Sequence, residues 1–264
     1  MDGAARLRLA RGLRAFQLAA RRLRIGHETD RLLTVLGGIA DRELRFFRFA
    51  EHLRHQSPTD AGWVILRLWE RIALGDGRLK EICLGLLDAR RLHDSLGPTN
   101  LQAVREAMAA NGEEGAVLLD PRDRRPDAGD DDAVPRPKEP VGYRISLARR
   151  PIRRQLERML FDPDARVIRS ILGNPRLTEA DVVALGASRR ASAEVLEVIA
   201  QDSRWITRYP VRLALANNPA APTHLIVSLL PYLLRQDLRA LASSSPRQDV
   251  RAHAQALLER QLEG

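Results

Sequence analysis

The sequence predicts an all-α protein in which an N-terminal helical domain is joined by a flexible linker to a short irregular α-solenoid. Hydrophobic residues make up 44% of the 264 residues but aromatic residues only 4%, which favours helical cores of Leu, Ala, Ile and Val. Helix-capping residues recur along the chain, and no segment reads convincingly as a strand. A Pro-rich acidic stretch, residues 118–142, separates the two halves.

The first part, residues 1–117, reads as an all-helical domain of about six helices. Ser57 to Asp60 supplies capping side chains before an apolar helical pattern, and Gly75 to Gly77 ends it. Thr99 and Asn100 open the last helix in the same way. The expected helices cover residues 5–24, 28–37, 39–55, 60–74, 78–94 and 99–111.

The linker, residues 118–142, contains five Pro and an acidic cluster at residues 130–132. It has almost nothing to bury, so folding would not offset the entropy of ordering it. We therefore expect a disordered tether.

A repeated phrase marks the second part, residues 143–264. "RLALANNP" (212–219) and "RALASSSP" (239–246) match closely, and "RSILGNP" (169–175) is one residue shorter. Each is followed by a helix start, and a further copy capped by Ser192 lacks the Asn-Pro pair. Pro prevents the first helix from continuing, and the cap starts the next one. Stacked pairs of this kind predict an α-solenoid of about three to four irregular units.

The stretch "VRLALANNPAAPTHLIVSLL" (211–230) resembles the leucine-rich repeat variant family of HEAT-like α-solenoids. The matching positions are Val211, Arg212, Ala214, Ala216, Asn218, Pro219, Pro222 and Leu229. With weaker copies at 162–200 and 236–260, the resemblance covers about two-fifths of the chain. It implies a helical-repeat architecture and no particular activity. The cysteine cluster that binds iron–sulfur in some members of the family has no counterpart here.

The charge is strongly positive and is concentrated in the second part. The formal net charge is +9, and residues 143–264 carry 19 basic and 12 acidic side chains. Such a surface suits acidic proteins, nucleic acids or anionic membranes. All but two of the basic residues are Arg, a bias that a GC-rich genome also produces without selection for binding.

One candidate binding surface lies on a predicted helix over residues 144–160. There Arg150, Arg154 and Arg158 recur at four-residue spacing and form a basic ridge suited to phosphates or an acidic partner. The alternative is a solvated outer face, with Ile152, Leu156 and Leu160 directed inward.

A second candidate surface is "RWITRYP" (204–210), in which Trp205 and Tyr209 alternate with Arg204 and Arg208. Aromatic and cationic side chains together are typical of binding hot spots and of surfaces that stack bases. Packing between repeat units explains Trp205 equally well. Arg212 is a further candidate, although its place in the repeat also fits a structural role.

A third candidate surface is the basic amphipathic segment 6–24, whose pattern would allow contact with an anionic membrane. A terminal helix that packs its apolar stripe on the core is the favoured interpretation.

No catalytic, cofactor-binding or metal-binding constellation is expected. His52 and His55 have no further His or Cys nearby, and His93-Asp94 lacks a nucleophile. "LGDGRLK" (74–80) lacks the features of a phosphate-binding loop. The single Cys83 indicates a reducing compartment, and the longest apolar run is too short to span a bilayer, so we expect a cytoplasmic protein.

These observations favour a non-enzymatic adaptor that binds a protein partner with an acidic segment. The expected anchors are Arg150, Arg154, Arg158, Trp205, Arg208 and Arg212. A nucleic-acid-binding protein that makes phosphate contacts with the same surface is the alternative. A helical-repeat glycosylase is disfavoured because no motif in the sequence indicates a catalytic carboxylate next to an aromatic pocket.

Overall fold

The structure is a computed structural model that describes residues 20–21, 23–75, 77–110, 114–120 and 137–263. Every regular element in these ranges is a helix, as the sequence predicts. A helix over residues 23–37 begins the described N-terminal half. It is followed by α2 (Arg42–Arg54), α3 (Pro58–Leu74), α4 (Gly77–Cys83), α5 (Ala89–Leu96), α6 (Pro98–Ala110) and the 3-10 helix η1 (Glu114–Leu119).

Helix boundaries in this half follow the capping residues, with two corrections. The Ser57 side chain accepts a hydrogen bond from the Asp60 N–H, as expected for the start of α3. The predicted helix over 78–94 is instead two helices, because Gly85 has a φ of 88° and the Asp88 side chain caps α5. The predicted break before residue 28 is absent, since one helix runs through 23–37. Most of the predicted helix over 5–24 lies outside the described residues.

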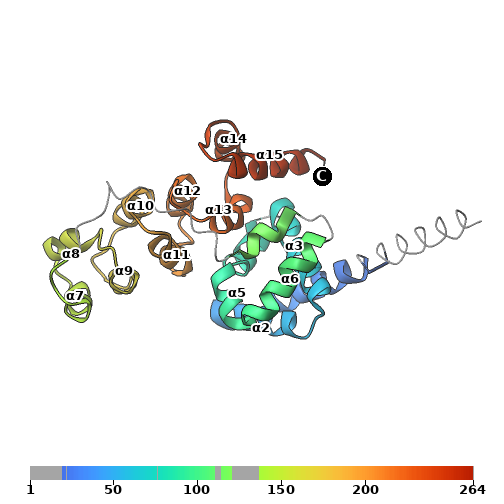
Figure 1. Ribbon diagram of the computed structural model, residues 1–264, viewed down its shortest axis with the longest axis horizontal. Coiled ribbons are helices and arrows are strands. Elements are labelled where there is room, and N and C mark those ends of the chain that lie inside the picture. The colour runs from blue at the N-terminus through green and yellow to red at the C-terminus, as the bar shows by residue number, and fades with distance from the viewer. Residues whose placement is uncertain (1–19, 22, 76, 111–113, 121–136, 264) are drawn as a thin grey trace, which may run out of the picture.

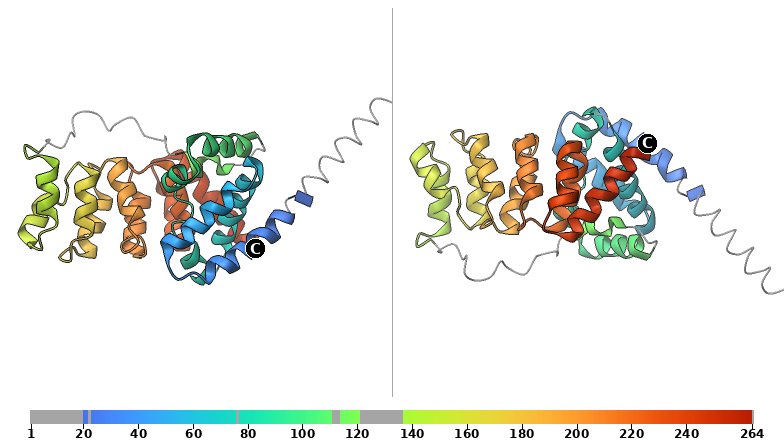
Figure 2. Two further views of the ribbon diagram at one scale, coloured as in Figure 1. Left: turned by 90° about the horizontal axis from the view of Figure 1, so that it is seen from below. Right: turned by 90° about the horizontal axis from the view of Figure 1, so that it is seen from above.

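The C-terminal half consists of short antiparallel helices in two rows (Figure 1). One row holds α7, α9, α11 and α13, the other α8, α10, α12 and α14, and the side views in Figure 2 show neighbours stacked along each row. The bounds are α7 (Val141–Ala148), α8 (Arg153–Met159), α9 (Ala165–Leu172), α10 (Glu179–Ala187), α11 (Ala193–Gln201), α12 (Tyr209–Asn217), α13 (Thr223–Leu229), η3 (Leu230–Tyr232), α14 (Arg235–Ser244) and α15 (Gln248–Glu263).

Buried asparagines join neighbouring helices within a row. The Asn218 amide, after α12, donates to the carbonyls of Gly186 (2.7 Å) and Ser188 (2.9 Å) at the end of α10. The Asn174 amide, after α9, donates to the carbonyls of Ala148 (2.6 Å) and Arg150 (2.9 Å) at the end of α7. Each asparagine thus donates to two carbonyls at the end of a neighbouring helix, where carbonyls lack intrahelical donors. The Arg150 and Ser188 carbonyls also accept from the backbone N–H groups of Ile152 and Ala191.

This arrangement corrects the alignment of the repeated phrases. The copies at 212–219 and 239–246 end α12 and α14, which belong to one row, whereas 169–175 ends α9 in the other row. A small polar residue followed by Pro is a local helix-ending signal. The phrase therefore recurs in both rows without marking equivalent helices.

The predicted linker is shorter than residues 118–142. Leu118 and Leu119 are fully buried in η1, and α7 already begins at Val141, so both ends of the stretch belong to helices. The two leucines stay with the N-terminal core because apolar burial favours it. Residues 121–136 lie outside the described part of the chain.

The two halves pack against each other and share one hydrophobic core. The N-terminal helices contact α13, η3 and α15, and Figure 2 shows them beside that end of the stack. The Trp69 indole donates to the Val227 carbonyl at 3.4 Å, and the Gln261 amide to the Ala73 carbonyl at 3.2 Å. The halves therefore form one packed body in the residues described.

A buried charge cluster lies at this junction. The Glu197 carboxylate of α11 is 2.9 Å from Arg90 Nε of α5 and 3.4 Å from His224 Nε2 of α13. Glu197 and His224 are both almost fully buried. A carboxylate in such a place needs these partners, so the cluster fixes how the halves meet.

Candidate functional site

The predicted basic ridge is broken, because residues 144–160 do not form one helix. α7 ends at Ala148 and α8 begins at Arg153, with Pro151 between them. Arg150 therefore lies in the connection, whereas Arg154 and Arg158 lie on α8. All three are exposed, which suits either the predicted ridge or a solvated face. Leu156 and Leu160 are buried, as the solvated-face alternative expects, but Ile152, which that alternative also directs inward, is 50% exposed.

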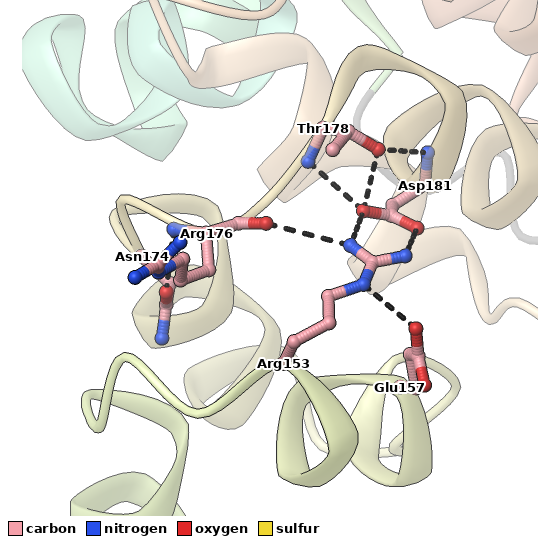
Figure 3. A network of polar contacts seen from close by, with 6 residues as sticks. All are labelled: Arg153, Glu157, Asn174, Arg176, Thr178 and Asp181. Atoms are coloured by element: carbon pink, nitrogen blue, oxygen red, sulfur yellow. Dashed lines mark hydrogen bonds and ion pairs between the residues drawn. The ribbon is translucent and has the colours of Figure 1, made fainter.

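The arginine beside this predicted ridge, Arg153, has a structural role (Figure 3). Its guanidinium binds both carboxylate oxygens of Asp181 on α10 and donates to Glu157 on its own helix at 2.7 Å. The Asp181 carboxylate also accepts from the Thr178 backbone N–H (2.9 Å) and hydroxyl (2.6 Å), in a capping box at the start of α10. This network holds α8 to α10, and the hydrogen bonds from Arg153 hold the pKa of Asp181 down at about 2.

An open groove between α7 and α9 is lined by three arginines and no carboxylate. Its volume is about 620 Å³, and it is lined by Ile145, Arg149, Arg166, Arg169, Ser170, Gly173 and Asn174. We call this the basic groove. Arg149 comes from the end of α7, and Arg166 and Arg169 come from α9 at three-residue spacing.

Asn174 positions the end of α7 within the basic groove. Its amide holds the carbonyls of Ala148 and Arg150, the two residues that flank Arg149, and its side-chain oxygen accepts from the Arg176 N–H at 2.9 Å. Because Asn174 is buried and uses all these bonds, the backbone that carries Arg149 is fixed.

Two of the three arginines in the basic groove have no acidic partner among the described residues. Arg166 pairs with Asp164, at 2.7 Å from Nη2 to Oδ2, and this hydrogen bonding lowers the pKa of Asp164 to about 2. Neither Arg149 nor Arg169 makes an ion pair with a described residue, and three arginines with one carboxylate leave a charge of +2. The groove is thus suited to an anionic group.

The prediction of an aromatic binding surface at residues 204–210 is wrong for Trp205. Its ring is only 3% exposed, and its indole donates to the Leu172 carbonyl of α9 at 2.9 Å. Tyr209 is also engaged, because its hydroxyl contacts Asp237 and accepts from the Leu234 N–H at 3.0 Å. Both aromatic rings join helices, so packing explains them.

Arg212, expected as an anchor or a structural residue, is structural. Its guanidinium donates to the carbonyls of Ile206 (2.9 Å) and Thr207 (2.8 Å) in the connection before α12. Arg208 remains exposed, with Glu179 at 3.8 Å, and so stays available to a partner at little cost.

The remaining sequence candidates carry no built site in the part of the chain that is described. His52 lies 3.7 Å from Glu28, and no three His, Cys, Asp or Glu side chains in the described ranges gather to hold a metal ion. Among the same residues, no helix is both long and apolar enough to cross a bilayer. Most of the amphipathic segment 6–24 lies outside the described residues.

Comparison with known proteins gives no relative for this chain. No protein-family model, curated protein or solved structure matches it. The resemblance to leucine-rich repeat variants therefore stays a prediction from the phrase at 211–230.

Sequence reasoning missed the basic groove because its arginines come from separate helices. Arg149 lies beside the predicted ridge without belonging to it, and Arg166 and Arg169 lie on another helix, so none of the three is among the predicted anchors. The one available signal was Asn174 in "RSILGNP", which marks where α9 meets the end of α7.

Proposed function

We propose that the protein is a non-enzymatic adaptor that binds an acidic segment of a protein partner through the basic groove. The observation that carries this proposal is the pair Arg149 and Arg169, which face one open groove without an acidic partner among the described residues. A guanidinium presents paired N–H donors that match a carboxylate, so two such groups can hold two acidic side chains. Arg150, Arg154 and Arg158, in the connection after α7 and on α8, are also exposed and add positive charge to this end of the stack.

The geometry favours a protein segment over a nucleic acid. The groove offers a local charge of +2 rather than a long track of cations along a phosphate backbone. The aromatic ring that would have stacked on a base, Trp205, is buried between helices. A short acidic peptide needs neither feature.

Fluorescence anisotropy of a labelled glutamate-rich peptide tests the proposal with the full-length chain. The test variant is Arg149→Ser with Arg169→Ser, and the matched control is Arg235→Ser with Arg239→Ser, which removes two exposed arginines from α14. We expect the groove variant to weaken binding about tenfold or more and the control to change it little. Affinity should also fall as salt rises.

A labelled DNA duplex measured in parallel decides between the two functions. Equal losses for the groove and control variants would mean that the peptide senses only net charge, which would contradict the proposal. Tighter binding of the duplex at physiological salt, with a steep salt dependence reduced by the groove variant, would replace the adaptor with a nucleic-acid-binding protein.

A further inference from the structure

The connections between the stacked helices gather along two opposite edges of the stack, as Figure 2 shows. Because the helices alternate in direction, the connections after α7, α9 and α11 share one edge, and those after α8, α10 and α12 share the other. The first edge consists of residues 149–152, 173–178 and 202–208. The opposite edge consists of residues 160–164, 188–192 and 218–222.

Side-chain hydrogen bonds hold the three connections of the first edge together. The Asn174 amide donates to the Arg150 carbonyl, and the Asn174 side-chain oxygen accepts from the Arg176 N–H, so one side chain bonds to the backbone of both arginines. The Trp205 indole, in the third connection, donates to the Leu172 carbonyl at the end of α9. Neighbouring connections are therefore fixed relative to one another.

The two edges differ in charge. The opposite edge contains two arginines, Arg189 and Arg190, and two acidic residues, Asp162 and Asp164. The first edge contains five arginines and a single acidic residue, Asp202. Among these connections the positive charge is therefore concentrated on the first edge. Its arginines are Arg149, Arg150, Arg176, Arg204 and Arg208.

The arginines of the first edge are accessible to a partner. All five are exposed, and only Arg208 has a carboxylate of the described residues nearby, Glu179 at 3.8 Å. The Arg204 guanidinium lies over the Trp205 ring, 4.3 Å from its centre. The Asp202 carboxylate accepts from the backbone N–H groups of Arg204 and Trp205 and so shapes the connection. The guanidinium groups thus keep donors for an anionic ligand.

The basic groove opens onto the first edge. Three of the residues that line it, Arg149, Gly173 and Asn174, belong to the first two connections. Arg150 directly follows Arg149, and Arg176 is bonded to Asn174 through its backbone. The first edge therefore continues the site of the proposed function from α9 towards α11.

The spacing of the connections matches an extended peptide. Packed helices lie about 8–10 Å apart, so neighbouring connections repeat at roughly that distance. An extended chain advances about 3.3 Å per residue, so about three residues span one step. Acidic side chains at every third position of an extended segment would therefore meet arginines in successive connections.

Other anionic ligands fit the first edge less well. An amphipathic helix needs an apolar surface, and in these three described connections Ile152 alone is a large apolar side chain that is exposed. A phosphate backbone is charged at every unit, so it would place a negative charge beside Asp202. A peptide can have an uncharged residue at that position.

We infer that the first edge binds an extended acidic segment of a partner protein whose carboxylates recur at about every third residue. One carboxylate binds at Arg149 in the basic groove, and the following ones bind Arg176 and Arg204. The inference rests on the proposed function and deepens it, because it gives the conformation of the acidic segment and the spacing of its charges.

The probes are two labelled peptides of equal composition, measured with the full-length chain. In the spaced peptide Glu occupies every third position among Ser residues, and in the block peptide all Glu residues are consecutive. The edge variant is Arg176→Ser with Arg204→Ser, which changes no residue that lines the basic groove. The matched control is Arg189→Ser with Arg190→Ser on the opposite edge. Because all four side chains are exposed, far-UV circular dichroism should remain unchanged for both variants.

Fluorescence anisotropy should show that the edge variant weakens binding of the spaced peptide about tenfold, whereas the control changes it little. Arg176→Ser alone should give a smaller loss. The block peptide binds in the basic groove, so the edge variant should change its affinity little. Arg149→Ser with Arg169→Ser, the groove variant, should weaken both peptides.

The same measurements separate failure of the inference from failure of the proposed function. Equal losses of the spaced peptide with the edge and control variants would overturn the inference, and the proposed function would stand if the groove variant still weakened both peptides. No effect of the groove variant on either peptide would contradict the proposed function and, with it, the inference. A single-stranded oligonucleotide that binds more tightly than the spaced peptide at physiological salt, and is weakened by the edge variant, would replace the peptide with a nucleic acid.

Discussion

Replacing Asn218 by Ala should destabilise the protein far more than replacing its neighbour Asn217. Asn218 is 2% exposed, and its side chain makes three hydrogen bonds: to the carbonyls of Gly186 and Ser188, and from the N–H of Ala220 at 2.8 Å. A net contribution of about 0.5–1.5 kcal/mol each gives a loss of roughly 3 kcal/mol. The Gly186 carbonyl of α10 then loses its amide donor, whereas the Ser188 carbonyl keeps the Ala191 N–H as a donor.

Asn217 is the matched control because it is the same residue type one position earlier. It is exposed, and its amide bonds only to the Leu213 carbonyl of its own helix at 2.9 Å. Asn217→Ala should therefore change the free energy of unfolding by about half a kcal/mol or less, since Ala is the better helix former. Urea denaturation followed by far-UV circular dichroism measures both variants. Equal losses for the two would refute the view that Asn218 joins α12 to α10.

Three further predictions concern buried or paired groups. Arg153 holds the pKa of Asp181 at about 2, below its ordinary 3.8, so the ionised carboxylate stabilises the fold fully above pH 3.8. The free energy of unfolding should fall as the pH drops from 3.8 towards 2. Asp181→Asn should flatten this part of an acid-unfolding curve. Burial raises the pKa of Cys83 to about 12, so Ellman's reagent should label it at neutral pH only after denaturant is added, and rapid labelling of the native protein would contradict its burial. Glu197→Gln should lower the free energy of unfolding, measured by urea denaturation, by about 2 kcal/mol. This loss is smaller than for a fully buried ion pair because 31% of the Arg90 side chain is exposed. An unchanged denaturation midpoint would show that the cluster does not hold the halves together.

Local signals in the sequence predicted local structure well. The capping side chains of Ser57 and Ser192 start helices where expected, and the helix start expected after the phrase at 169–175 is the capping box of Thr178 and Asp181. The apolar positions of the repeats, such as Leu196, are buried. These features depend on residues a few positions apart, so the sequence contains the needed information.

Features that depend on how helices meet could not be predicted in the same way. A Trp between two arginines looks alike whether it faces solvent or a neighbouring helix, and only the bond to the Leu172 carbonyl shows that Trp205 is internal. Arg149 and Arg169 form one groove because Asn174 ties the end of α9 to the end of α7. Pro151 is the signal in the sequence that separates α7 from α8 within residues 144–160, because Pro cannot continue a helix that precedes it.

The most direct test of the adaptor function observes the arginine side chains of the basic groove while a partner-like ligand binds. The Nε–Hε NMR signals of Arg149 and Arg169, assigned through Arg→Lys variants, would be followed during titration with the glutamate-rich peptide. Arg235 and Arg239 on α14 serve as internal references. We predict that the two groove signals shift and saturate together while the reference signals stay in place. Equal small shifts at all four arginines would contradict the proposal, because they would show that the peptide binds to the overall positive charge and not to the groove.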